Sequence, residues 1–189
     1  LRLAREGATV VAADISDARL GELAAGNPDL ALIPVTADIA IGDGVAAVAA
    51  RAGGRVDALA NVAGIMDGFL PPAEIDDQTW ERVFAVNVTS MMRMTRAVLP
   101  IMLAAGGGAI VNVSWVGNRI VIDNYAAVAA SKAALESLTR YLAVEFGPHG
   151  IRSTRPRPGC WSARPCACSR AASRCWRRWR PGPRSAGSA

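Results

Sequence analysis

The feature that most constrains the fold is an alternation of short apolar runs with longer helical patterns in residues 1–150. Runs rich in Val, Ile and Ala at 8–13, 30–36, 56–62 and 109–113 predict strands. Helical patterns separate or follow them, at 18–25, 44–52, 76–105 and 124–146. Because these strands are continuously apolar, both of their faces must be covered. The sequence therefore predicts an α/β fold of βαβ units, with a parallel sheet between two layers of helices.

Small or polar residues stand where each predicted strand ends. Asp14 closes the first, Asp38 and residues 61–64 follow the next two, and Ser114 follows the fourth. A single residue of this kind is more often a helix cap or part of a turn than part of a site. Four together favour a site, because ligands of such folds bind beyond the carboxyl ends of the strands.

Composition divides the chain near residue 151. Residues 1–150 hold 11 Lys and Arg against 16 Asp and Glu, a net charge of −5, whereas residues 151–189 hold ten Arg and no acid, a net of +10. The overall charge of +5 therefore does not describe a basic surface. We expect a partial domain over residues 1–152 and a disordered basic tail over residues 153–189.

The tail contains all the cysteines, and their spacing differs from the paired spacing of zinc ligands, so we predict no metal site. Its arginines, with Trp161, Trp176 and Trp179, are an alternative signal for single-stranded nucleic acid. We favour disorder and expect no nucleic-acid partner. No apolar run of 18 residues exists and no signal peptide is visible, so we expect no membrane partner. Residues 1–150 contain no cysteine, which suits a cytoplasmic protein.

Six short patterns give residues 1–152 a resemblance to the short-chain dehydrogenase/reductase family. In chain order they are the helix end at 3–8, Asp14, Asp38-Ile39, Asn61-Val62-Ala63-Gly64, Asn87 within Val-Asn-Val-Thr, and Ala-Ala-Ser131-Lys132. The resemblance implies a Rossmann-type doubly wound parallel sheet and hydride transfer between a nicotinamide cofactor and a carbonyl or alcohol carbon. It also implies a small-molecule substrate and a homo-oligomer for the intact family member.

The same resemblance assigns roles to the matching residues. Asp14 would bond the adenosine ribose, and an acid there favours NAD over NADP because it repels a 2′-phosphate. Asp38 and Ile39 would bracket the adenine, and Asn61, Ala63 and Gly64 would contact the cofactor. Lys132 would hold the nicotinamide ribose and lower the pKa of a catalytic tyrosine. Asn87 would hold a water that relays protons.

Two positions depart from the family pattern, and both concern proton transfer. Val128 stands four residues before Lys132, where the family has tyrosine, and Trp115 stands where it has serine. Ser114 and Tyr125 are the nearest replacements, but Ser114 is one residue early and so faces the other side of its strand. Tyr125 lies seven residues before Lys132, about 10 Å along a helix instead of about 6 Å.

The catalytic candidates are therefore Asn87, Lys132, Ser114 and Tyr125, with Tyr125 expected to be a loop or packing residue. Two descriptions stay open: an NAD(P)-dependent oxidoreductase, or a catalytically inactive fragment of one with a non-native tail. The residues at 115 and 128 favour the second for this chain.

The ends of the chain also depart from the family. We expect an incomplete sheet that lacks the family's first strand, its glycine-rich turn and its last strands, which leaves strand edges unpaired. After Arg152 the family continues Val-Asn-x-x-x-Pro-Gly, whereas this chain reads Ser-Thr-Arg-Pro-Arg-Pro-Gly. A one-base shift of a GC-rich back-translation restores the family reading. We therefore expect the tail to be read in a shifted frame, which DNA sequencing across codon 152 would test.

Overall fold

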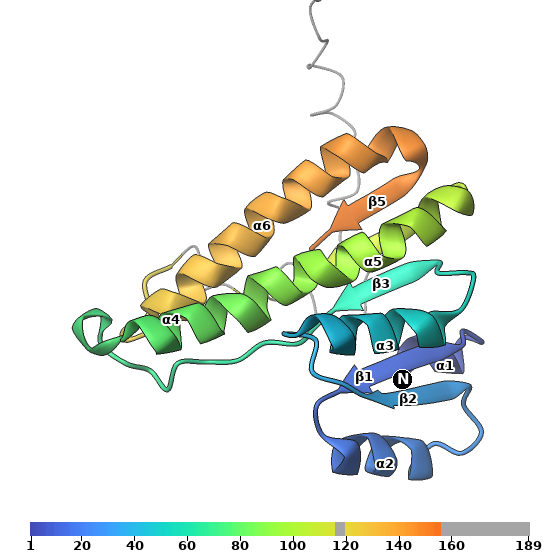
Figure 1. Cartoon of the computed structure of the whole chain (residues 1–189), viewed down its shortest axis with the longest axis horizontal. Coiled ribbons are helices and arrows are strands. Elements are labelled where there is room, and N and C mark those ends of the chain that lie inside the picture. The colour runs from blue at the N-terminus through green and yellow to red at the C-terminus, as the bar shows by residue number, and fades with distance from the viewer. Residues whose placement is uncertain (116–119, 156–189) are drawn as a thin grey trace, which may run out of the picture. The chain divides into compact units, whose positions relative to one another are not determined.

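Five parallel strands in two sheets form the framework of the computed structural model, which describes residues 1–115 and 120–155 (Figure 1). In one sheet β1 (Val10–Asp14) pairs with β2 (Leu32–Thr36). In the other, β4 (Gly108–Asn112) lies between β3 (Ala58–Asn61) and β5 (Ile151–Thr154). The four predicted strands are confirmed, and β5 is additional to them. The expected disordered tail, residues 153–189, is wrong at its start, because Ser153 and Thr154 belong to β5; from residue 156 onwards it lies outside the described residues.

The helices follow the predicted pattern closely. They are α1 (Arg2–Arg5), α2 (Asp17–Ala25), α3 (Gly42–Ala52), α4 (Asp77–Phe84), the π-helical η2 (Ala85–Thr89), α5 (Ser90–Ala104) and α6 (Ala126–Phe146), with short 3-10 turns η1 (Pro72–Glu74) and η4 (Gly147–His149). The predicted helix 76–105 is thus two α-helices joined by a π-helical turn. Asp76 caps the start of α4, because its carboxylate accepts a hydrogen bond from the Thr79 N–H at 2.7 Å.

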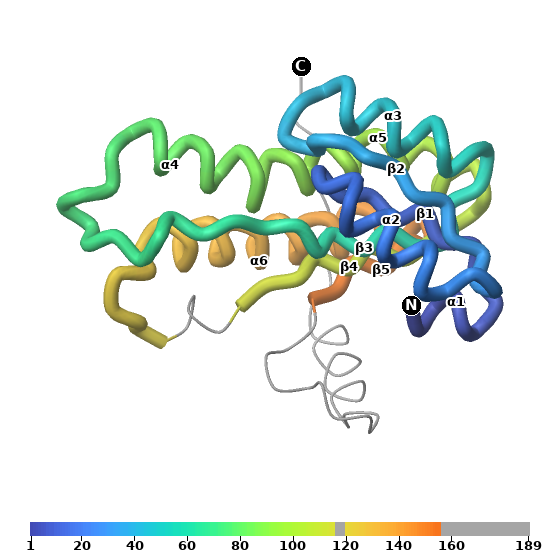
Figure 2. The backbone as a smooth tube through the Cα atoms, turned by 90° about the horizontal axis from the view of Figure 1, so that it is seen from below, coloured from blue at the N-terminus to red at the C-terminus, as the bar shows by residue number. Residues whose placement is uncertain are grey.

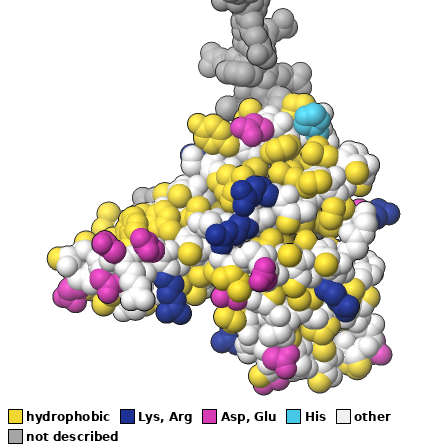
Figure 3. Space-filling model, in the orientation of Figure 1, with side chains coloured by type: hydrophobic (Ala, Val, Ile, Leu, Met, Phe, Trp, Pro, Cys, Tyr) yellow, Lys and Arg dark blue, Asp and Glu magenta, His cyan; other side chains and the backbone are white. Residues whose placement is uncertain are grey.

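Helices pack beside the strands and beside one another. The α4–η2–α5 segment and α6 run side by side in both views (Figures 1 and 2), and α6 contacts both α4 and η2. Two apolar clusters fill the space between α5 and the strands. One contains Val98, Met102 and Ile110, and the other contains Val45 and Met94. On the outside, basic side chains lie among hydrophobic ones over α5 (Figure 3).

The two sheets do not join. Among the described strands, β1 pairs only with β2, and β3 pairs only with β4. Ala13 in β1 and Ala58 and Ala60 in β3 are exposed, although the apolar composition of both strands is typical of strands that are covered on both faces. The expected interruption of the sheet is therefore confirmed. Helices connect the two parts instead, because α3 contacts β1, β2 and α5, and α5 contacts β3 and β4.

Two kinds of feature are absent from the part of the chain that the structure describes. None of its helices is long and apolar enough to cross a membrane. No group of three or more His, Cys, Asp or Glu side chains within 1–115 and 120–155 is placed to hold a metal ion.

The close approach of α3 to the loop after β2 predicts a specific sensitivity at Gly44. A β-carbon at this position would lie 2.0 Å from the Asp38 carbonyl oxygen, so backbone would have to move. We expect Gly44→Ala to cost about 2 kcal/mol of unfolding free energy and to lower the Tm by about 4–8 °C. Thermal unfolding followed by circular dichroism measures this.

Gly21→Ala is the matched control. Gly21 is an exposed residue within α2, and a β-carbon there meets nothing within 4 Å. The control should be neutral or stabilise by about 0.5–1 kcal/mol, because alanine is the better helix former. Equal Tm values for the two variants would contradict the close approach.

Candidate functional site

Asn87 is the best-connected polar side chain among the predicted site residues. It lies in the π-helical turn η2 and is fully buried. Its Oδ1 accepts from the Ile65 N–H at 2.8 Å, and its Nδ2 donates to the Ile65 carbonyl at 3.0 Å. The same Nδ2 donates to Ser131 Oγ at 3.1 Å. One amide therefore ties the loop after β3 to α6, and π-helical turns of this kind often occur at functional sites.

Gly64, Asn87 and Lys132 meet beyond the carboxyl end of β3. A β-carbon on Gly64 would lie 3.3 Å from Asn87 Oδ1 and 3.4 Å from Lys132 Nζ. Glycine is the residue that lets this loop approach the amine and the amide so closely. Three residues that come from separate motifs in the sequence thus converge at one point.

The Lys132 ammonium is buried and has a backbone partner. Its Nζ donates to the Val113 carbonyl at 3.0 Å, at the end of β4. Burial lowers the pKa of this ammonium, because removing it from water disfavours the charged form. The amine therefore faces the ends of β3 and β4, where a ligand of a parallel sheet would bind.

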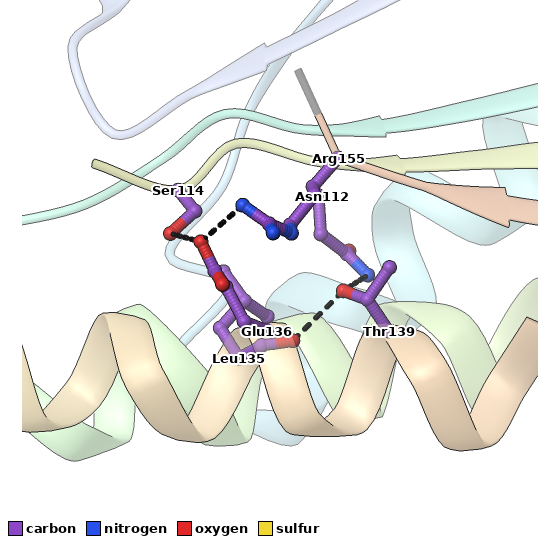
Figure 4. Close-up of polar contacts among 6 residues, drawn as sticks. All are labelled: Asn112, Ser114, Leu135, Glu136, Thr139 and Arg155. Carbon is purple, nitrogen blue, oxygen red and sulfur yellow. Dashed lines mark hydrogen bonds and ion pairs between the residues drawn. The ribbon is translucent and has the colours of Figure 1, made fainter. Parts of the chain in front are cut away.

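Ser114, the residue after Val113, bonds to α6 through its side chain. Its hydroxyl is buried and donates to Glu136 Oε1 at 3.1 Å, between the end of β4 and α6 (Figure 4). Arg155, at the end of β5, also donates to Glu136 Oε1, at 2.5 Å. The Ser114 hydroxyl therefore joins the end of β4 to α6, at a residue one helical turn beyond Lys132.

Asn61 lies in a second buried network. Its Nδ2 donates to Asn112 Oδ1 at 2.8 Å, and the Asn112 amide donates to Thr139 Oγ1 at 3.0 Å. Thr139 in turn donates to the Leu135 carbonyl at 2.8 Å (Figure 4). These bonds join β3, β4 and α6, so Asn61 has a structural function here whatever its part in binding a cofactor.

The two departures from the family pattern have opposite environments. Val128 is only 2% exposed and packs in an apolar cluster with Val83 and Ala127, whereas Trp115 is 51% exposed. Tyr125 precedes the first residue of α6 and belongs to the same apolar cluster as Val128. Burial, and secondarily the charge of Asp67, raise the pKa of the Tyr125 hydroxyl. This makes it a weaker proton donor than an ordinary tyrosine.

The predicted adenosine-side residues lie on the loops after β1 and β2. Asp14 Oδ1 accepts from the Ser16 N–H at 2.9 Å, and Asp38 Oδ1 accepts from the Ala40 N–H at 2.8 Å. Each carboxylate thus shapes its own turn with one oxygen. Ile39 packs against the apolar cluster beneath α3, and Ala63, next to Gly64, is exposed.

Sequence reasoning did not identify Glu136, Arg155 or Ile65 as parts of these networks. Glu136 follows Lys132 by one helical turn and therefore lies on the same face of α6. An acid on the face that is expected to contact the sheet was the one signal in the sequence for a buried polar contact. Arg155 and Ile65 have no such signal, because their partners lie 19 and 22 residues away in the chain.

Parallel strands with helices, and polar residues gathered at the strand ends, define a Rossmann-type α/β protein. Residues 1–161 match the family model described as enoyl-(acyl carrier protein) reductase. The chain belongs to the short-chain dehydrogenase/reductase family.

Relatives and solved structures agree with this family. The chain is 35% identical over 166 residues to 3beta-hydroxysteroid dehydrogenase 2 of Eggerthella lenta, which covers 84% of the chain and 63% of the relative. It is 32% identical to the 3-ketoacyl-(acyl-carrier-protein) reductase of Brucella melitensis complexed with NADH, with a TM-score of 0.78 over 82% of this chain and 66% of that one.

A metagenomic short-chain oxidoreductase in complex with NADP is 29% identical, with a TM-score of 0.77 over 84% of this chain and 74% of that one. The chain spans between about half and two thirds of the length of the curated relatives it matches.

The buried Glu136–Arg155 pair should contribute measurably to stability. Glu136→Gln keeps the shape of the side chain but leaves the Arg155 guanidinium without its carboxylate, and both side chains are mostly buried. We expect a loss of about 2 kcal/mol. Glu145→Gln, an exposed position on the same helix, should change stability by no more than about 0.5 kcal/mol. Urea unfolding of both variants would reveal the difference, and equal midpoints would argue against the pair.

The lowered pKa of Lys132 predicts how stability depends on pH. The unfolded chain holds the lysine proton up to about pH 10.4, whereas the folded chain releases it earlier. The unfolded state therefore binds more protons across this interval, and folding stability rises with pH there. Lys132→Met should remove that rise. Urea unfolding between pH 7 and 10 tests this, and parallel stability curves for the two proteins would contradict the lowered pKa.

Proposed function

We propose that this chain carries the site of an NAD(P)-dependent oxidoreductase that interconverts a carbonyl and an alcohol, with its proton-transfer positions altered. The observation that carries the proposal is the convergence of Gly64, Asn87 and Lys132 at the carboxyl ends of β3 and β4. The family supplies the reaction type, because its relatives include dehydrogenases and reductases of this class. A small-molecule substrate follows from the same reaction type.

The described residues fit a dinucleotide. A β-carbon at position 64 would lie 3.3 Å from Asn87 Oδ1 and 3.4 Å from Lys132 Nζ, so this loop passes close to the amide and the amine. Lys132 offers an ammonium to ribose hydroxyls, and Asp14 and Asp38 offer carboxylate oxygens at the ends of β1 and β2. A bound nicotinamide would supply or accept the hydride. The residues of this chain would hold and orient it.

We further propose NAD in preference to NADP. Asp14 closes β1, and a carboxylate at that place repels a 2′-phosphate. The structural relatives include complexes of both kinds, so this preference depends on Asp14 alone. We also propose a cytoplasmic setting, which the absence of cysteine from residues 1–150 suggests, and a homo-oligomer, which the family resemblance implies.

A second candidate function is a family member that lacks catalytic activity. Val128 favours it, because this buried side chain has no ionisable proton and stands where the family has its tyrosine. The Tyr125 hydroxyl, with its raised pKa, is a poor replacement. In this second case the chain would bind the cofactor weakly or not at all and would transfer no hydride.

Restoring the family residues separates the two candidates. Both candidates predict that the chain itself shows no NADH-dependent reduction of cyclohexanone. Only the active-site proposal predicts that the Trp115→Ser/Val128→Tyr double variant gains this activity, because a hydroxyl returns beside Lys132. NADH binding, followed by nicotinamide fluorescence, should be present in both proteins and stronger than NADPH binding. Asp14→Asn removes the charge that repels the 2′-phosphate. This variant should therefore lower the ratio of NADH affinity to NADPH affinity at least about tenfold.

The controls decide which candidate stands. Lys132→Met in the double variant should remove the gained activity. If neither protein binds NADH, or if the folded double variant binds NADH without any turnover, the active-site proposal fails and the inactive candidate replaces it. Circular dichroism establishes folding, since Val128→Tyr adds volume to a packed cluster.

A further inference from the structure

An apolar pocket lies beside the proposed site. It has a volume of about 400 Å³ and is lined by Met66, Phe69, Trp115, Ile122 and Tyr125. The size is within the range of small-molecule pockets. Its walls come from the loop after β3, the segment after β4 and the segment that leads into α6. Of the five lining side chains among the described residues, three are aromatic, and their polar groups are the indole N–H of Trp115 and the phenol hydroxyl of Tyr125.

The loop at Asp67–Phe69 holds one wall in an unusual backbone conformation. Gly68 and Phe69 have φ values of +86° and +63°, and a bulky residue such as phenylalanine rarely adopts the second. The Phe69 N–H donates to Asp67 Oδ1 at 3.1 Å, which closes the turn. The ring of Phe69 then lies 5.7 Å from the ring of Tyr125, centroid to centroid. Strained loops of this kind often occur at ligand sites.

A buried carboxylate lies behind this wall. Asp67 is only 9% exposed, and its Oδ2 has no hydrogen-bond partner among the residues that the structure describes. Its charge also acts on Tyr125, where it adds to the effect of burial on the pKa of the hydroxyl. A negative charge in an environment of low dielectric repels a second one strongly. An anionic ligand in the pocket would therefore be disfavoured twice, by the apolar walls and by Asp67.

We infer that this pocket selects uncharged, apolar, ring-containing ketones and alcohols and excludes carboxylates. The inference rests on the proposed oxidoreductase function, for which it names the substrate class. The flat faces of Phe69, Trp115 and Tyr125 suit a ring, and aromatic walls stabilise such contacts by packing. The Tyr125 hydroxyl is the group that would meet the keto or hydroxyl oxygen of the ligand.

Two ketones of the same ring and different charge test the inference. 4-tert-Butylcyclohexanone and 4-oxocyclohexanecarboxylate differ in one substituent, apolar in the first and anionic in the second. Binding of each to the full chain, without cofactor, is measured by ligand-observed saturation-transfer NMR and by calorimetry. We expect the apolar ketone to bind at least ten times more tightly. Equal affinity for the two probes, or no binding of the apolar one, would overturn the inference.

Variants at the pocket sharpen the test. Asp67→Asn keeps the Oδ1 acceptor of the Phe69 N–H but removes the charge, so the carboxylate probe should bind more tightly and the ratio should fall at least threefold. Met66→Glu should weaken 4-tert-butylcyclohexanone binding at least fivefold. Val144→Glu, an equally exposed apolar position on α6, should leave it unchanged. Two results would overturn the inference: an Asp67→Asn variant with the same ratio of affinities for the two probes, or equal effects of Met66→Glu and Val144→Glu on the binding of 4-tert-butylcyclohexanone.

These measurements are independent of hydride transfer. Because the probes are titrated without cofactor, a chain that discriminates between them but binds no NADH contradicts the proposed function and leaves the pocket's selectivity intact. A chain that binds NADH but treats the two probes alike contradicts the selectivity alone.

Discussion

The hydrogen bonds of the Asn87 amide hold the candidate site together. Its oxygen and nitrogen bond both polar groups of the Ile65 backbone, and its nitrogen also reaches Ser131 on α6. Because the side chain is fully buried, each of these bonds would be expensive to lose. Gly64 precedes Ile65, and Lys132 follows Ser131. The relative placement of the glycine and the lysine is therefore set by one amide, presented by the π-helical turn in which it lies.

Much of this arrangement could be predicted from the sequence, because burial is encoded locally. Continuous apolar runs predicted both ends of each strand from β1 to β4 to within two residues. The motif residues Gly64, Asn87 and Lys132 lie close together in the structure. The short strand β5 was not predicted, since four residues give too little pattern to distinguish a strand. Nor was the π-helical turn, which has the same apolar period as the α-helices on either side. The Glu136–Arg155 pair depends on a contact between distant segments, which no local pattern encodes.

Trp115 and Val128 do not take part in the hydrogen bonds that hold Asn87 and Lys132 in the proposed site. The Asn87 amide and the Lys132 amine of the proposed site are held by hydrogen bonds, whereas the two positions that depart from the family pattern carry a buried valine and an exposed tryptophan. In the family the lysine acts on a tyrosine. Here the Lys132 ammonium has the Val113 carbonyl as its hydrogen-bond partner, and burial lowers its pKa. In the proposed site, cofactor binding and proton transfer would therefore depend on different residues.

The interrupted sheet gives the proposed dinucleotide site an unusual mechanical basis. Asp14, the residue proposed to meet the adenosine, lies on the β1–β2 sheet. Lys132 packs against the β3–β4–β5 sheet, and no strand pairing joins the two sheets among the described residues. The distance between Asp14 and Lys132 is set by side-chain packing instead. Val11 of β1 and Leu59 of β3 contact the same apolar cluster, which α3 and α5 complete, and Arg93 on α5 donates to the Ala40 carbonyl next to Ile39. Apolar packing is less directional than a ladder of hydrogen bonds. The spacing between the two ends of a dinucleotide is thus set by the volume of the side chains in this cluster.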